Sequence, residues 1–146
     1  MINDQVILTI AILIGFPVFF VALWSGICFG LGFVSGWQAL ASQRGLQAPP
    51  DSSDMSSISG RMGFVNYNGV LVLKLDPQSV TLWTHALFRV GHRPLRFSHA
   101  DVECLGASRL FLLKGRRFRL LNQATLFVTE SAGAALERWH ASAPTQ

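Results

Sequence analysis

Charge is missing from the first part of this 146-residue sequence. Residues 5–43 contain no Asp, Glu, Lys or Arg, and within residues 6–34 the only hydroxyl-bearing side chains are Thr9 and Ser25. As a helix, residues 6–34 would be about 43 Å long at about 1.5 Å per residue. A bilayer core of about 30 Å needs only about 20 residues. The missing charge therefore predicts an N-terminal transmembrane helix.

The features of a cleaved secretory signal are also largely missing. Such a signal has a basic start, an apolar core of roughly 7–15 residues and a small-residue cleavage site. Residues 1–5 have no basic side chain, and the apolar run is about twice too long for a signal. We therefore expect a retained anchor.

Basic residues are confined to the later part of the chain, because all 12 Lys and Arg lie at or beyond Arg44. Positively charged flanks remain on the cytoplasmic side of a membrane. We therefore expect a single-pass membrane protein, with its N-terminus outside and its C-terminal domain in the cytoplasm.

Cysteine is scarce, and the groups that bind metals are scattered. Cys28 falls in the predicted span and Cys104 in a predicted strand, which indicates neither a disulfide framework nor a metal site. No histidine has metal-ligand spacing with a cysteine or carboxylate beside it. The four histidines are His85, His92, His99 and His140.

Motifs for catalysis are absent too. The sequence contains no Walker loop, dinucleotide fingerprint or nucleophile elbow. Asp101 and Glu103 would share one face of a strand, but the pattern favours surface charge there over acid–base chemistry. We expect no enzyme activity, no cofactor and no metal. We also expect no nucleic-acid binding, because only Phe118 interrupts the basic run near the C-terminus.

Glycine is abundant at the end of the apolar run. Gly26 and Gly30 are four residues apart, as are Gly32 and Gly36, and such pairs let a second helix approach closely. The pattern predicts helix packing with a second copy or another membrane protein, although glycine is common in spanning helices generally. Trp37 then suits the membrane–water interface, where its ring can lie among headgroups.

The composition changes after the apolar run. Residues 48–57 are rich in Pro, Ser and Asp, which is typical of a linker. The sequence thus predicts a transmembrane helix with a juxtamembrane extension over 1–43, a polar linker over 44–59, a folded domain over 60–142 and a tail over 143–146.

The predicted domain consists of short strands and one helix. Apolar and polar residues alternate in short runs between turn residues over 60–129, which is typical of a small sandwich or barrel. Gly115 between strands 109–114 and 116–122 indicates a hairpin turn, and residues 86–90 continue the alternation of a strand. Residues 130–141 have helical spacing. The fold class is therefore α+β, with about seven strands and a terminal helix.

Three segments of this domain resemble pleckstrin-homology-like domains of the bacterial or GRAM-like kind: residues 67–71, 88–95 and 97–102. Uncharacterised bacterial single-pass membrane proteins are similar and also have Gly-Trp after the span, as at residues 36–37. This chain departs from their pattern at Arg93 and Ser98. The resemblance implies a bent seven-stranded barrel or sandwich capped by the C-terminal helix, in the bacterial inner membrane. It marks a fold and not a reaction.

Basic side chains form two groups, one around a loop and one around a hairpin. These groups could meet anionic headgroups, dock an acidic patch of a partner, or remain solvated. The first contains Arg89, Arg93 and Arg96, and the second contains Lys114, Arg116, Arg117 and Arg119.

These observations favour a non-enzymatic accessory or scaffold subunit of a larger membrane protein complex. It would be attached through helix packing in the bilayer and through its cytoplasmic domain. The complex could be respiratory, photosynthetic, secretory or transport, or the partner could be a second copy. The alternative is a membrane-anchored domain that binds anionic lipid headgroups through its basic loops.

Overall fold

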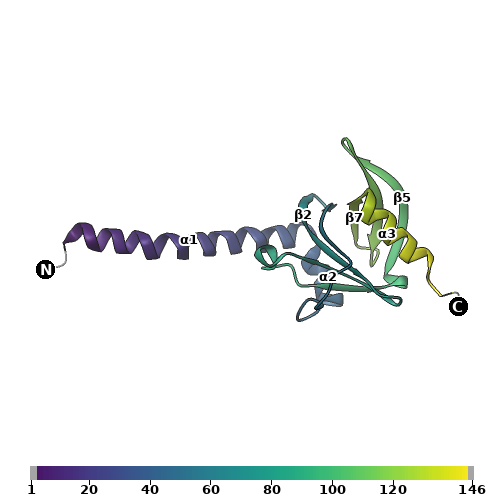
Figure 1. Ribbon diagram of the computed structural model, residues 1–146, viewed down its shortest axis with the longest axis horizontal. Helices are drawn as coiled ribbons and strands as arrows, with labels where there is room; N and C mark the ends of the chain where they lie inside the picture. Colours follow the sequence, from purple (N-terminus) through teal and green to yellow (C-terminus); the bar gives the residue numbers. More distant parts are fainter. Residues whose placement is uncertain (1–2, 145–146) are drawn as a thin grey trace.

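The computed structural model describes residues 3–144 as a long helix that projects from a curled sheet (Figure 1). Helix α1 spans Asp4–Val34, the short helix α2 spans Trp37–Arg44, and helix α3 spans Glu130–Ala141. The strands are β1 (Met55–Met62), β2 (Val65–Leu75), β3 (Ser79–Thr84), β4 (Leu95–Ser98), β5 (Val102–Leu110), β6 (Leu113–Leu120) and β7 (Ala124–Thr129). Two single 3-10 turns, η1 (Ala86–Phe88) and η2 (His99–Asp101), flank β4.

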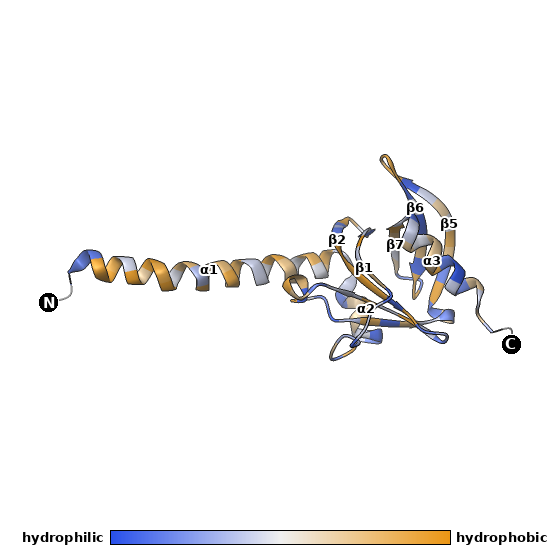
Figure 2. Ribbon diagram, viewed as in Figure 1, coloured by the Kyte–Doolittle hydropathy of each residue, from blue (hydrophilic) through white to orange (hydrophobic). Residues whose placement is uncertain are grey.

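Helix α1 is apolar over nearly its whole length (Figure 2). Among the described helices, it alone is long and apolar enough to cross a membrane. It ends at Val34 because Gly36 has a φ of +84°, a left-handed conformation that costs glycine little and that turns the chain into α2. The two helices are therefore separate elements.

All seven strands form one antiparallel sheet in the order β4-β3-β2-β1-β7-β6-β5. Strands β4 and β5 are consecutive in sequence, yet they form the two opposite edges of the sheet. The sheet therefore curls into a half-barrel. The prediction of an α+β fold with seven strands and a C-terminal helix is confirmed.

The core is enclosed by the curled sheet and two helices. Helix α3 packs on β5, β6 and β7, and α2 packs beside β4. Alternation along each strand places one set of side chains inside. The largest fully buried side chains of this core are Trp37, Leu40, Met62, Leu71, Leu73, Leu82, Leu95, Phe97, Phe118, Leu120, Leu126 and Leu136.

Three local expectations differ from the structure. The hairpin turn lies at Phe111 and Leu112, and the prediction of a turn at Gly115 is wrong, because this glycine lies inside β6 where a Cβ would collide with the Val128 carbonyl. Strand β1 begins at Met55, inside the range predicted as linker. Residues 86–88 form a 3-10 turn instead of a strand.

Candidate functional site at the junction of α1 and the sheet

The loop between β3 and β4, residues 85–94, lies along the last third of α1. The indole Nε1 of Trp24 donates a hydrogen bond of 2.8 Å to the Leu87 carbonyl. The rings of Trp24 and Phe88 pack with their centroids 5.4 Å apart. The loop is thus attached to the helix ten residues before the helix ends.

About two turns further along α1, two backbones touch without side chains between them. Gly91 has a φ of +73°, and a Cβ on it would lie 2.7 Å from the Cα of Phe29. A Cβ on Gly32 would collide with the Gly91 carbonyl. Gln38 of α2 donates a hydrogen bond of 3.1 Å from Nε2 to the Phe29 carbonyl. Only glycine at positions 32 and 91 permits this approach.

A buried chain of hydrogen bonds follows where α1 ends. The hydroxyl of Tyr67, from β2, lies 3.0 Å from Oγ of Ser35 and 2.9 Å from Nε2 of His92. The exposed fractions are 3% for Ser35, 5% for Tyr67 and 2% for His92. The chain thus connects the end of α1, the sheet and the β3–β4 loop.

The protonation of this chain follows from its partners. Nδ1 of His92 lies 3.1 Å from the Val90 carbonyl, which can only accept, so Nδ1 holds a proton. Burial lowers the pKa of His92 and keeps the ring neutral, so its unprotonated Nε2 and Oγ of Ser35 compete for the single proton of the Tyr67 hydroxyl. Burial likewise raises the pKa of the Tyr67 phenol. These groups form a neutral connection and not a charged catalytic pair.

Trp37 lies inside the domain, although the sequence predicted an interface anchor among headgroups. Its side chain is fully buried, and its Nε1 donates a hydrogen bond of 2.8 Å to the Arg93 carbonyl. Its ring lies 5.7 Å from Tyr67 and 5.1 Å from His92, between centroids. Trp37 therefore joins α2 to the buried hydrogen-bond chain and cannot contact lipid in this arrangement.

An ion pair at the other end of α2 completes the attachment. Arg44 makes a bidentate pair with Asp101, with Nε–Oδ2 at 2.9 Å and Nη2–Oδ1 at 3.0 Å. Asp101 also accepts a hydrogen bond of 2.9 Å from the Ser98 amide, and the Arg44 contact lowers the pKa of this carboxyl. Asp101 is thus a structural residue of the α2 docking site, whereas the sequence indicated surface charge.

The predicted packing glycines fall into two groups. A Cβ on Gly26 or Gly30 would meet nothing within 4 Å. Each lies two residues from the buried Cys28, about 200° around the helix at about 100° per residue, so this pair faces away from the domain. Gly32 is instead covered by the chain's own loop, and Gly36 forms the turn into α2.

Within each of the two predicted basic groups, the structure distinguishes exposed side chains from buried or paired ones. In the first, Arg89, Arg93 and Arg96 are exposed, but His92 between them is buried. In the second, Arg116 pairs with Glu130 and Glu137 of α3, and Arg119 pairs with Glu103 of β5. Exposed basic side chains without such a pair, among the residues the structure describes, remain around the β5–β6 hairpin at Arg109, Lys114 and Arg117.

The hairpin of β5 and β6 has an exposed apolar tip that the sequence analysis missed. Phe111 is 88% exposed and Leu112 is 96% exposed. An apolar cavity of about 230 Å³ lies beneath the tip, between the hairpin and the ends of β1, β2 and β7. A search for apolar residues at turn positions would have found this tip, had the turn not been placed at Gly115.

The side chains that could bind a metal are scattered within residues 3–144. No group of three His, Cys, Asp or Glu side chains that could hold a metal is present in that range. The functional residues that sequence reasoning missed at the junction are Trp24, Ser35 and Tyr67. Two features of the sequence could have pointed to them. Tyr67 is the chain's single tyrosine, and Ser35 places a hydroxyl directly after the apolar run.

Comparison with protein-family models, with curated proteins and with solved structures finds no match to this chain.

Proposed function

We propose that this chain is a single-pass protein of the bacterial inner membrane, with its N-terminus outside and its half-barrel, a pleckstrin-homology-like domain, in the cytoplasm. It acts as a non-enzymatic accessory or scaffold subunit of a membrane protein complex. The observation that carries the proposal is the exposed apolar tip of the β5–β6 hairpin, which belongs to the folded domain and not to the apolar helix.

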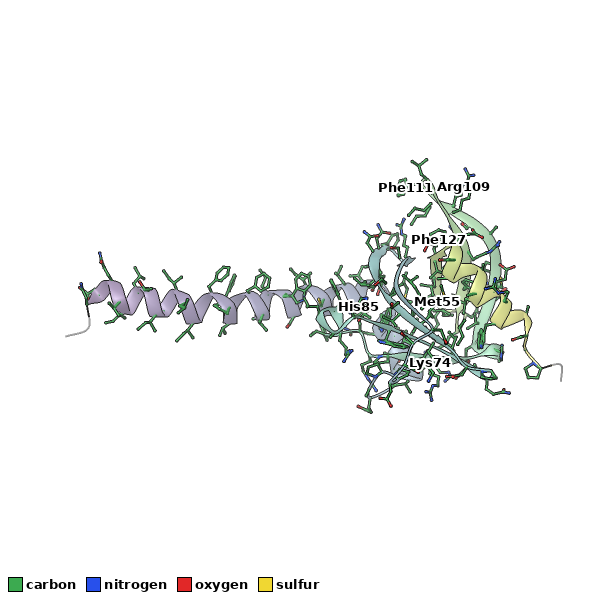
Figure 3. All side chains as sticks on the ribbon, in the orientation of Figure 1. Met55, Lys74, His85, Arg109, Phe111 and Phe127 are labelled. Atoms are coloured by element: carbon green, nitrogen blue, oxygen red, sulfur yellow. The ribbon has the colours of Figure 1, made fainter. Side chains whose placement is uncertain are left out.

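Bilayer contact does not account for this tip. The hairpin projects across the axis of α1 and not along it, so its tip is directed sideways (Figure 1). Figure 3 places Phe111 and Arg109 together at the end of the hairpin, away from the body of the sheet. Exposed aromatic and aliphatic side chains beside a cavity are typical of a protein-binding surface. We infer that the tip inserts into a neighbouring protein.

A second contact lies on the apolar helix α1. The open face with Gly26 and Gly30 points away from the domain, so a partner helix can approach it without meeting the β3–β4 loop. Two weak contacts on one partner reinforce each other through effective concentration, provided that both can be made together. The contacts of the junction support this condition, because they attach the domain that carries the hairpin to α1.

Charge favours a protein partner over headgroups at the hairpin. Two of its four predicted basic residues, Arg116 and Arg119, are already paired with carboxylates of the same chain. The exposed charges of Arg109, Lys114 and Arg117 surround an apolar tip, which suits a partner with an apolar pocket and an acidic rim.

Photo-crosslinking in intact membranes tests the proposal. A benzophenone amino acid at Leu112 is expected to give one discrete protein adduct. The same group at Ser52, exposed in the segment before β1, serves as the matched control and should give none. Gly26→Leu with Gly30→Leu should weaken the adduct. An adduct of twice the chain mass would identify a second copy as partner, and no adduct at Leu112 would contradict the proposal.

A further inference from the structure

We infer that the β3–β4 loop, at residues 86–90, is inserted into the interfacial layer of the bilayer that α1 spans. The inference rests on the spanning role proposed above for α1. It adds a second membrane contact, made by the folded domain itself, and sets the depth at which the domain is held.

The position of the bilayer edge follows from starting the hydrocarbon layer at Val6, the first residue of the apolar run. Val6–Leu23 contains 18 residues by the sequence numbering, about 27 Å at about 1.5 Å per residue, which is close to the hydrocarbon thickness of about 30 Å. Trp24 then falls at the boundary, where tryptophan is enriched in membrane proteins. The apolar run continues beyond this boundary to Val34. The β3–β4 loop lies on this last part of α1, from Trp24 onward.

The loop contacts the helix at this same depth. Its Leu87 carbonyl accepts from Trp24, and Phe88 continues a row of rings that runs along α1 from Phe20 through Trp24. Leu87 is 69% exposed and Val90 is 43% exposed. Their side chains therefore extend the apolar surface of the helix sideways, just where that helix leaves the hydrocarbon layer.

Several backbone groups of the loop are already paired, which lowers the cost of placing it in an apolar medium. The amide of Phe88 donates to the His85 carbonyl at 2.9 Å, and the amide of His92 donates to the Arg89 carbonyl at 2.9 Å. The Leu87 carbonyl is occupied by Trp24.

Arg89, the one charged side chain within residues 86–90, fits this placement. Arg89 is exposed beside Leu87 and Val90. A long arginine stem can lie along apolar surface while its guanidinium reaches lipid phosphates. We favour lipid over a protein partner at this loop, because the loop lies directly on α1 and α1 itself enters the bilayer beside it.

Depth-dependent quenching of a fluorophore tests the inference on the full chain. The nitrobenzoxadiazole label is attached at Leu87→Cys, Ile12→Cys or Leu112→Cys, each in a Cys28→Ala, Cys104→Ser background. The labelled chains are reconstituted in phosphatidylcholine–phosphatidylglycerol vesicles with brominated acyl chains. Leu112 is the matched control, because it is also a leucine with an exposed side chain, so lipid affinity of the label alone would act there too.

The expected result is quenching and blue-shifted emission at Ile12 and Leu87, with water-like and unquenched emission at Leu112. Adding Val90→Asp should release the loop and abolish the quenching at Leu87. Quenching at Ile12 without quenching at Leu87 would overturn the inference and leave the proposed anchor intact. Absence of quenching at Ile12 would overturn both, and equal quenching at Leu112 would overturn the assignment of the contact to this loop.

Discussion

The Tyr67 hydroxyl lies 2.9 Å from Nε2 of His92, so that a phenol of β2 and an imidazole of the β3–β4 loop share one buried hydrogen bond. The same hydroxyl lies 3.0 Å from Ser35, the residue that follows α1. One phenol therefore connects the end of the long helix, the sheet and the β3–β4 loop. This arrangement allows the junction to be tested one atom at a time.

Removing only that oxygen should loosen the junction. Tyr67→Phe leaves Nε2 of His92 and Oγ of Ser35 without their shared partner, and an unpaired buried polar group costs about 1–3 kcal/mol. We expect the free energy of unfolding of the domain, measured with urea in mild detergent, to fall by about that amount. The exposed Phe64→Leu provides the control and should change little. An unchanged stability in Tyr67→Phe would contradict the role given to the chain of hydrogen bonds.

Acid should weaken the same junction through His92. Burial lowers the pKa of this imidazole below its ordinary value of 6.5, so just below that pH the unfolded chain binds a proton that the folded chain does not. Stability from this group is therefore complete above about pH 6.5 and is lost as the pH falls through the folded pKa. His92→Gln should lower stability at neutral pH and flatten this part of the profile. Parallel profiles for the two proteins would show that another group is responsible.

The sequence predicted elements more successfully than their contacts. The predicted helix at 130–141 coincides with α3, because apolar side chains at helical spacing have one face to bury. The alternation of apolar and polar residues likewise predicted a fold of about seven short strands. Trp37 shows what local pattern lacks: a tryptophan after an apolar run suits an interface equally well, and only packing against Tyr67 and His92 buries it. Gly115 was assigned to a turn, whereas its small size is needed for contact with Phe127 inside β6.

The glycines of α1 should separate folding from association. Gly32→Ala places a methyl group against the Gly91 carbonyl, and such overpacking costs about 1–3 kcal/mol, so the 85–94 loop should separate from α1. Gly26→Ala meets open space and should leave domain stability unchanged or slightly raised. The readouts are urea unfolding and limited proteolysis of the 85–94 loop.

Substitutions at Gly26 and Gly30 should instead affect association with a partner and leave folding unchanged. Gly26→Leu with Gly30→Leu fills the open face and should reduce complex formation in mild detergent, measured by size-exclusion chromatography with light scattering, while the unfolding profile stays close to that of the parent chain. A loss of stability without a change in association would contradict the assignment of this face to a partner.

Charge reversal at the hairpin should distinguish a protein partner from lipid. Lys114 and Arg117 are exposed, so Lys114→Glu with Arg117→Glu should leave the fold intact and lower the rate and the salt dependence of partner association. Arg116→Glu is the informative contrast, because it would place a third carboxylate beside Glu130 and Glu137 and should destabilise α3. If headgroups were the true ligand of the hairpin, the double variant would instead weaken binding to anionic vesicles by about 1 kcal/mol for each basic side chain removed. Both vesicle co-sedimentation and Leu112 crosslinking should be performed on the same double variant. A protein partner predicts a loss of crosslinking with unchanged vesicle binding, and a headgroup ligand predicts a loss of vesicle binding.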